Sequence, residues 1–289
     1  MELRIRCAFR MLLYSCLLQK LFSQEATPPQ QPPPYDSKTI LKYLADGDLD
    51  SAYHALEETF WTSERNPDPS QVERPITKRK QQRGAGLLYT TEYKLQADIE
   101  QAEYLAKQVP SLKELFAHRV IPIYQKVLDR IPPVDDLPHG LYAFTEQDAQ
   151  DGILSVYNKA LHLPRVKELV DAEGRRRSLF NPTLNPQQIQ NQWDHGGEHY
   201  PAGIVVIDDL LSEEALGQIR KLLLESTVFY QTKLPKEFGG YTGAYLDDGL
   251  HDRILLELTI QLREFLPKLL SSHPLRYLWA YKYSSTNKG

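Results

Sequence analysis

Cysteine is almost absent from this sequence, and its two cysteines, Cys7 and Cys16, lie within the first sixteen residues. In that segment three arginines precede the apolar run 11–18, which is the pattern of a short secretory signal peptide. Cleavage near Ser23 would leave a mature chain that has no cysteine, so disulfides could not stabilise it. We therefore predict a signal peptide at 1–23 and a place in the secretory pathway, in the endoplasmic reticulum lumen or outside the cell. An organelle transit peptide or an ordinary amphipathic helix is the alternative.

Long hydrophobic runs and an excess of positive charge are missing as well. The run 11–18 is much shorter than the roughly 20 apolar residues of a membrane-spanning helix, so no membrane span is expected. Lys and Arg number 34 against 38 Asp and Glu, for a net charge of −4, which gives no indication of nucleic-acid binding or of an anionic membrane surface. The expected partner is a protein or a small-molecule substrate. With 289 residues, 41% of them hydrophobic, the chain can form one large or two modest domains.

The first part of the chain after the signal peptide is expected to be a linker followed by a helical hairpin. Residues 24–36 contain a proline-rich stretch, which favours an extended polyproline-type linker. At 37–63 apolar residues recur at helical spacing on both sides of Asp46-Gly47-Asp48, which predicts two helices joined by a turn. Tetratricopeptide-like arrays consist of such pairs, but no second copy follows at a fixed spacing, so this resemblance is weak. Residues 64–84 are polar and end in a basic run at 78–83; they are interpreted as a solvated linker or, alternatively, as a processing or anion-binding site.

Residues 85–170 are predicted to be a helical region. Thr91 is a plausible N-cap, and the first helix has an apolar stripe with acidic residues on its other side. The second helix is expected to bend near Pro122. The stripe consists of Leu95, Ile99, Ala102 and Leu105.

Residues 171–200 are interpreted as a loop. Two histidines and two acids fall within six residues at 194–199, which raises the question of a metal site. The neighbouring glycines indicate a mobile loop that would not aim the ligands, so no metal site is predicted there.

From residue 201 the pattern changes to α/β. We predict a strand at 204–207, a helix capped by Ser212, a strand at 228–233, a hairpin at 238–249 and a helix at 252–269. From Leu275 to Tyr283 apolar and aromatic residues alternate with polar ones, which predicts a strand with one packed face.

The order and spacing of several motifs in this last third resemble a known enzyme family. They are VIDDLLSEEA at 206–215, LEST at 224–227, GGYTGAYLDDG at 239–249 and the strand LWAYKY at 278–283. Together they are similar to the front half of a prolyl 4-hydroxylase-like Fe(II)/2-oxoglutarate dioxygenase domain, and 95–105 and 157–164 look like the helical region that precedes it. The resemblance implies an α+β fold in which an N-terminal helical region is followed, from 201 to 289, by the incomplete front half of a double-stranded β-helix (jelly-roll) oxygenase domain.

The same resemblance implies a cofactor pair, Fe(II) and 2-oxoglutarate, and hydroxylation of a protein or small-molecule substrate. None of the eight histidines is followed two positions later by Asp or Glu, so the family's His-x-Asp ligand pair, its distant His and its oxoglutarate-binding Arg are expected beyond Gly289. This chain is therefore expected to bind neither cofactor and to be inactive as it stands. Tyr281 and Tyr283 are the candidate cofactor-binding residues, since the family often uses a tyrosine of this strand to hold the far carboxylate of oxoglutarate.

Two alternatives remain open from the sequence. Either tyrosine could instead be packed in the core with its hydroxyl satisfied locally. The whole chain could also be a non-catalytic, secreted helical interaction protein with a degenerate α/β platform.

Overall fold

The computed structural model describes residues 37–63, 65–68, 89–232 and 240–283. The predicted signal peptide, the proline-rich linker and most of the 64–84 linker lie outside the described residues. The described part is α+β, as predicted, with more helix than strand. Its helices are α1 (Ser37–Asp46), α2 (Leu49–Trp61), α5 (Glu92–Gln108), α6 (Lys113–Leu115), α7 (Ile121–Leu128), α8 (Glu146–Gln150), α9 (Pro186–His195), α10 (Glu213–Glu225), α12 (Arg253–Phe265) and α13 (Pro267–Leu270), and its strands are β1 (Tyr89–Thr90), β2 (Tyr142–Ala143), β3 (Gln231–Thr232), β4 (Tyr241–Tyr245) and β5 (Trp279–Tyr283).

Helices α1 and α2 form the predicted hairpin. Gly47 lies at the turn with φ of 77°, a left-handed conformation that glycine adopts without a steric penalty. The Asp48 side chain accepts a hydrogen bond from the Ser51 amide and so caps α2. The apolar faces of both helices pack against Leu256 and Ile260 of α12, so this hairpin is covered by the C-terminal part of the chain.

Helices α5, α6 and α7 form a second helical unit with a core of its own. The hydroxyl of Thr91 accepts a hydrogen bond from the Lys94 amide at 3.0 Å, which confirms the predicted N-cap of α5. The predicted stripe from Leu95 to Leu105 is buried. A π-helical turn, Phe116–Val120, precedes Pro122, and such turns accommodate an interruption of the regular helical ladder.

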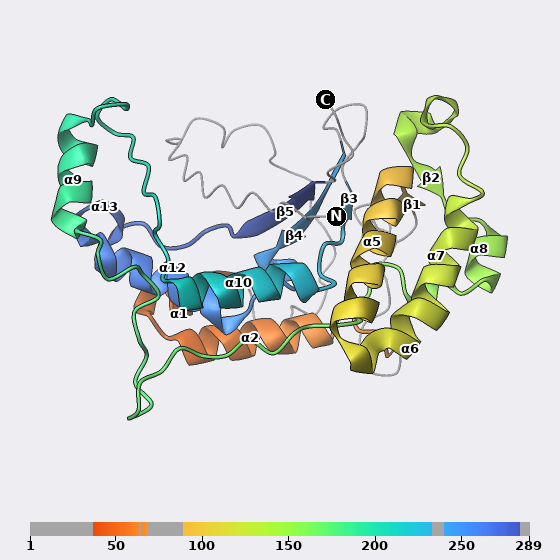
Figure 1. The fold of residues 1–289 in the computed structure, drawn as a ribbon, viewed down its shortest axis with the longest axis horizontal. Helices are drawn as coiled ribbons and strands as arrows, with labels where there is room; N and C mark the ends of the chain where they lie inside the picture. Colours follow the sequence, from red (N-terminus) through yellow and green to blue (C-terminus); the bar gives the residue numbers. More distant parts are fainter. Residues whose placement is uncertain (1–36, 64, 69–88, 233–239, 284–289) are drawn as a thin grey trace.

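Helices α10 and α12 lie beneath the C-terminal sheet, together with α2 (Figure 1). Ser212 caps α10 by accepting from the Ala215 amide, and Asp252 caps α12 by accepting from the Ile254 amide. In Figure 1 the α5–α8 unit lies at one end of this layer and α9 with α13 at the other.

The C-terminal sheet has three antiparallel strands in the order β3-β4-β5. Strand β5 pairs with β4 along its whole length, from Tyr241 opposite Tyr283 to Tyr245 opposite Trp279. A two-stranded pair, β1-β2, lies near α5. The described strands form no closed barrel, so the finer prediction of a jelly-roll core is not established by this fold.

Several predicted elements differ from the structure. The predicted loop 171–200 contains α9, which Asn185 caps and Pro186 begins. Residues 204–207 form no strand, and Ile204 and Val206 are exposed. Within 240–249, the described part of the predicted hairpin 238–249, there is one strand, β4, followed by the 3₁₀ turn Leu246–Asp248. Regular strand structure in the aromatic segment begins only at Trp279. No described helix is both long enough and apolar enough to span a bilayer.

Candidate functional site

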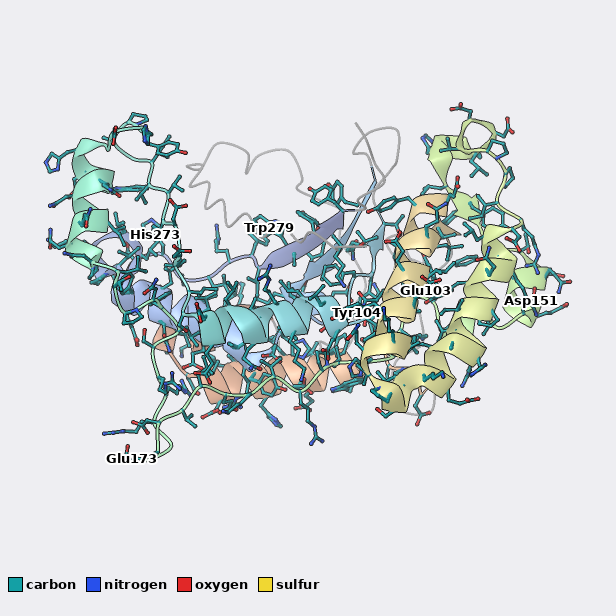
Figure 2. The ribbon with its side chains drawn as sticks, viewed as in Figure 1. Glu103, Tyr104, Asp151, Glu173, His273 and Trp279 are labelled. Atoms are coloured by element: carbon teal, nitrogen blue, oxygen red, sulfur yellow. The ribbon has the colours of Figure 1, made fainter. Side chains whose placement is uncertain are left out.

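The two faces of the β4-β5 ladder carry different chemistry. Successive residues of a strand point to opposite faces, so Trp279, Tyr281 and Tyr283 share one face of β5 and Lys282 lies on the other. Tyr241 and Tyr245 extend the aromatic face onto β4. Trp279 is 50% and Tyr283 63% exposed. Figure 2 shows Trp279 on the side of the sheet that faces away from the α2, α10 and α12 layer.

The structure places the two candidate tyrosines on the same face of β5, where both contact Tyr241 of β4. The Tyr241 ring lies between them, with centroids 4.9 Å from Tyr281 and 5.2 Å from Tyr283. The Tyr281 hydroxyl is 3.3 Å from that of Tyr245. Tyr281 is half-buried in this cluster, whereas Tyr283 is exposed. Tyr281 is therefore held by aromatic and polar contacts that Tyr283 largely lacks.

On the opposite face of β5, Lys282 contacts α5. The Lys282 ammonium donates to Oε1 of Gln101 and lies 3.9 Å from the centroid of the Phe229 ring. The amide nitrogen of Gln101 donates to the Leu224 carbonyl at 2.6 Å, which orients its oxygen toward Lys282. Burial lowers the pKa of Lys282 to about 7, because the opposing attraction of Asp98 is weaker and Lys94 adds like charge.

Lys94 and Asp98 form a buried ion pair one turn apart on α5. The Lys94 side chain is only 2% exposed and also lies over the ring of Tyr157, with 5.1 Å from Nζ to the centroid. Burial lowers the pKa of Lys94 and raises that of Asp98, and the mutual attraction of the pair opposes both shifts. The sequence pattern placed the acids of this helix on its solvated side, so Asp98, which is 18% exposed and pairs with the buried Lys94, is a partly buried acid that the sequence analysis missed. Its only sequence signal is the i, i+4 spacing from Lys94.

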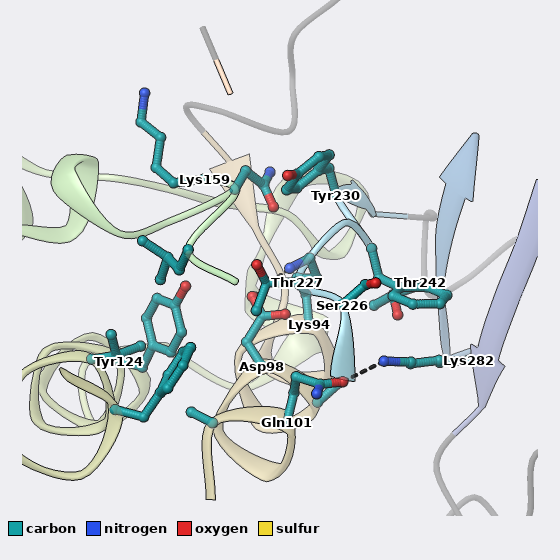
Figure 3. Close-up of a pocket in the computed structure, with 17 residues that line it drawn as sticks. Lys94, Asp98, Gln101, Tyr124, Lys159, Ser226, Thr227, Tyr230, Thr242 and Lys282 are labelled. Carbon is teal, nitrogen blue, oxygen red and sulfur yellow. Dashed lines mark hydrogen bonds and ion pairs between the residues drawn. The ribbon is translucent and has the colours of Figure 1, made fainter. Parts of the chain in front are cut away.

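A cavity of about 50 Å³ lies among these groups, between α5, β4, β5 and the segment 226–230. Figure 3 shows Lys282 extending from β5 toward Gln101, with Asp98 and Lys94 of α5 nearby. The Ser226 and Tyr230 side chains also line this space. Both are almost fully buried, and neither the Ser226 Oγ nor the Tyr230 OH has a hydrogen-bond partner among the described residues. Its apolar wall includes Phe116, Val120 and Phe229.

Asp248, in the 3₁₀ turn after β4, has a structural partner. Its two carboxylate oxygens accept from Nε and Nη2 of Arg65, at 2.8 and 3.0 Å. The Arg65 guanidinium also lies 4.3 Å from the Tyr230 ring centroid. Asp247, in contrast, is exposed.

The four candidate metal ligands at 194–199 do not form a metal site. Asp194 and His195 end α9, where Asp194 accepts from Gln190 and His195 contacts the Asn191 carbonyl. In the part of the chain that the structure describes, no three or more His, Cys, Asp and Glu side chains are grouped so that they could hold a metal ion. The described residues thus do not provide the three-ligand iron site that the resemblance implies.

Comparisons with protein-family models, with curated proteins and with solved structures found no match for this chain. The functional argument therefore depends on the residues and their geometry.

Proposed function

We propose that residues 201–283 are the beginning of an Fe(II)/2-oxoglutarate dioxygenase domain of the prolyl 4-hydroxylase type, and that the helices before it support this domain. The activity proposed for the complete domain is hydroxylation of a protein or small-molecule substrate. The iron ligands are not among the described residues, so no step of the reaction is assigned to the metal here.

The observation that supports the proposal is the antiparallel pairing of the aromatic strand. β5 pairs over five residues with β4 and leaves Trp279, Tyr281 and Tyr283 on one face. A sheet face with this much exposed aromatic surface is typical of a surface that other chain segments or partners cover. Further strands of a β-helix would cover such a face, and helices α10 and α12 already cover the opposite one.

Within this proposal Tyr281 is the residue that binds the far carboxylate of 2-oxoglutarate. Its ring is held by Tyr241 and Tyr245, so its hydroxyl has a fixed position from which it can donate to a carboxylate oxygen. Tyr283 is 63% exposed and contributes surface to the same face. Fe(II), when bound by residues outside this set, would supply the activation of dioxygen.

The proposal is tested by determining the transcript that encodes this chain. In the same reading frame, a His-x-Asp sequence should follow shortly after the codon for Gly289, with a further His and an Arg downstream. A stop codon directly after Gly289, or a continuation without these residues, would contradict the proposal and favour a non-catalytic interaction protein.

A further inference from the structure

The cavity between α5 and the C-terminal sheet carries an excess of positive charge. Lys94 and Lys282 both line it, and Asp98 is the one carboxylate among its described lining residues. Lys94 is paired with Asp98. Lys282 contacts a neutral amide, that of Gln101, and the face of the Phe229 ring. Lys282 is partly buried, and it contacts no carboxylate, although Asp98 attracts it from a greater distance. An anion bound beside it would stabilise its ammonium form.

Hydrogen-bond donors line the same cavity. The Ser226 Oγ and the Tyr230 OH are buried, and neither has a partner among the described residues. Thr242 is buried and lies directly opposite Lys282 in the β4-β5 register. Buried polar groups are nearly always hydrogen-bonded in folded proteins. The unpartnered hydroxyls of Ser226 and Tyr230 therefore indicate that a polar occupant belongs in the cavity. An anion with several oxygens can accept from hydroxyls and from an ammonium at the same time.

The size of the cavity restricts the occupant. It measures about 50 Å³, and a single water needs roughly 10–15 Å³ by this measure. The space therefore suits about three or four waters, or one anion of similar size.

We propose that this cavity is a binding site for a small oxyanion, with the Lys282 ammonium as its counter-ion and the Ser226 hydroxyl as a hydrogen-bond donor. The site lies on the face of β5 opposite Tyr281 and is independent of the proposed oxygenase function. A short carboxylate and an inorganic oxyanion present the same oxygens to these donors, and binding experiments distinguish the two.

The test is isothermal titration of the full chain with sodium acetate and, separately, with inorganic phosphate. Sodium chloride at equal ionic strength and acetamide, the neutral analogue of acetate, serve as controls. We expect saturable binding of acetate, of phosphate or of both, and none of acetamide. Binding of acetate identifies a carboxylate site, and binding of phosphate alone identifies an inorganic oxyanion site. Equal heats from acetate and acetamide, or no binding beyond the chloride control, would overturn the proposal.

Variants locate the binding. Lys282→Met should weaken it about tenfold or more, because a charge-assisted hydrogen bond is lost, and Ser226→Ala should weaken it less. If Lys282→Met does not fold, Ser226→Ala alone tests whether the anion binds in this cavity. Lys159→Met is the matched control, since Lys159 lines the cavity but its ammonium points away from the cluster in Figure 3. Affinity for acetate, whose own charge is constant in this range, should fall as pH rises from 6 to 8, because the amine of Lys282 loses its proton. Unchanged binding by both cavity variants would place the anion elsewhere and refute the assignment.

Discussion

The ring of Tyr281 lies directly across the sheet from Gly243. The two residues are register partners, and a Cβ added at Gly243 would be 3.0 Å from Cε1 of Tyr281 and 3.2 Å from its Cδ1. Because such distances are too short for carbon atoms in van der Waals contact, glycine at 243 provides the space that the ring occupies. The position of the proposed carboxylate-binding tyrosine therefore depends on a residue of the neighbouring strand.

Gly243→Ala should lower the free energy of unfolding by about 1–3 kcal/mol, as overpacking does in close-packed regions. The ring is held between Tyr241 and Tyr245 and cannot move freely. Gly217→Ala on α10 is the control, because nothing lies within 4 Å of its added Cβ and a glycine-to-alanine change within a helix stabilises by about 0.5–1 kcal/mol. Urea denaturation measures both. Equal effects of the two changes would contradict the contact between Gly243 and Tyr281.

Asp248→Asn should destabilise the fold by about 2 kcal/mol, between the values for exposed and buried ion pairs. The change removes the charge that both Nε and Nη2 of Arg65 contact, at a site where Arg65 is 8% and Asp248 21% exposed. Asp247→Asn is the matched control at the neighbouring, exposed position and should change stability by less than about 0.5 kcal/mol. Chemical denaturation at pH 7 distinguishes them, and a loss as large in the control would refute the structural role of the pair.

Asp148→Asn should cost about 3 kcal/mol at pH 7, because it removes the charge of a fully buried carboxylate that accepts from Thr145, Tyr142 and Arg130. Burial raises the pKa of Asp148, but hydrogen bonds from Thr145, Tyr142 and Arg130 outweigh it, so the net pKa is lowered. Ionised Asp148 therefore stabilises the fold fully above the pKa that it has in the unfolded state, about 3.9. This stabilisation is lost as pH falls through the lower pKa that it has in the folded state. The difference between wild type and variant should therefore shrink below about pH 4. Glu146→Gln, on the exposed side of the same helix, should show neither effect.

Lys282 should be the most reactive of the described lysines toward an acylating reagent near pH 7, because its pKa is lowered to about 7 and the neutral amine is the nucleophile. The unfolded state binds this proton up to about pH 10.4. As pH rises from about 7 to about 10.4, the free energy of unfolding of the wild type should therefore increase relative to that of Lys282→Met. Competitive labelling followed by mass spectrometry measures the reactivity. Labelling of Lys282 at the rate of exposed Lys268 would contradict the burial of its amine.

Local signals in the sequence were sufficient for most of the helices. Thr91 and Ser212 are caps that the sequence identifies, because a cap is decided by neighbours within one turn. The helix predicted from Asp252 begins one residue later, and Asp252 is its cap. Asn185 and Pro186 carry the same kind of signal for α9. Residues 186–195 are mostly polar and have only a narrow apolar stripe, which is why the composition predicts a loop there.

Features that depend on distant residues could not be predicted. The apolar run 204–207 has no neighbouring strand to pair with; Val205 and Ile207 pack instead against the α9 and α13 cluster. The cavity requires α5 and β5 to meet, and Gln101 and Lys282 are 181 residues apart in the chain. Alternation in β5 predicted which residues share a face, but the prediction that the aromatic face is the packed one is wrong: Trp279 and Tyr283 are exposed, and Ala280 and Lys282 face the helices. Which face is covered, and the partner of Lys282, follow only from the tertiary fold.

The central claim is that the aromatic face of β4 and β5 belongs to a 2-oxoglutarate dioxygenase. Consumption of 2-oxoglutarate by the product of the complete reading frame, in the presence of Fe(II) and a reductant, tests it most directly. We predict turnover that a chelator abolishes, with KM for 2-oxoglutarate about tenfold higher in Tyr281→Phe, as expected for the loss of one hydrogen bond to a carboxylate, and unchanged in Tyr283→Phe. Absence of turnover in a folded, iron-supplied protein would contradict the claim.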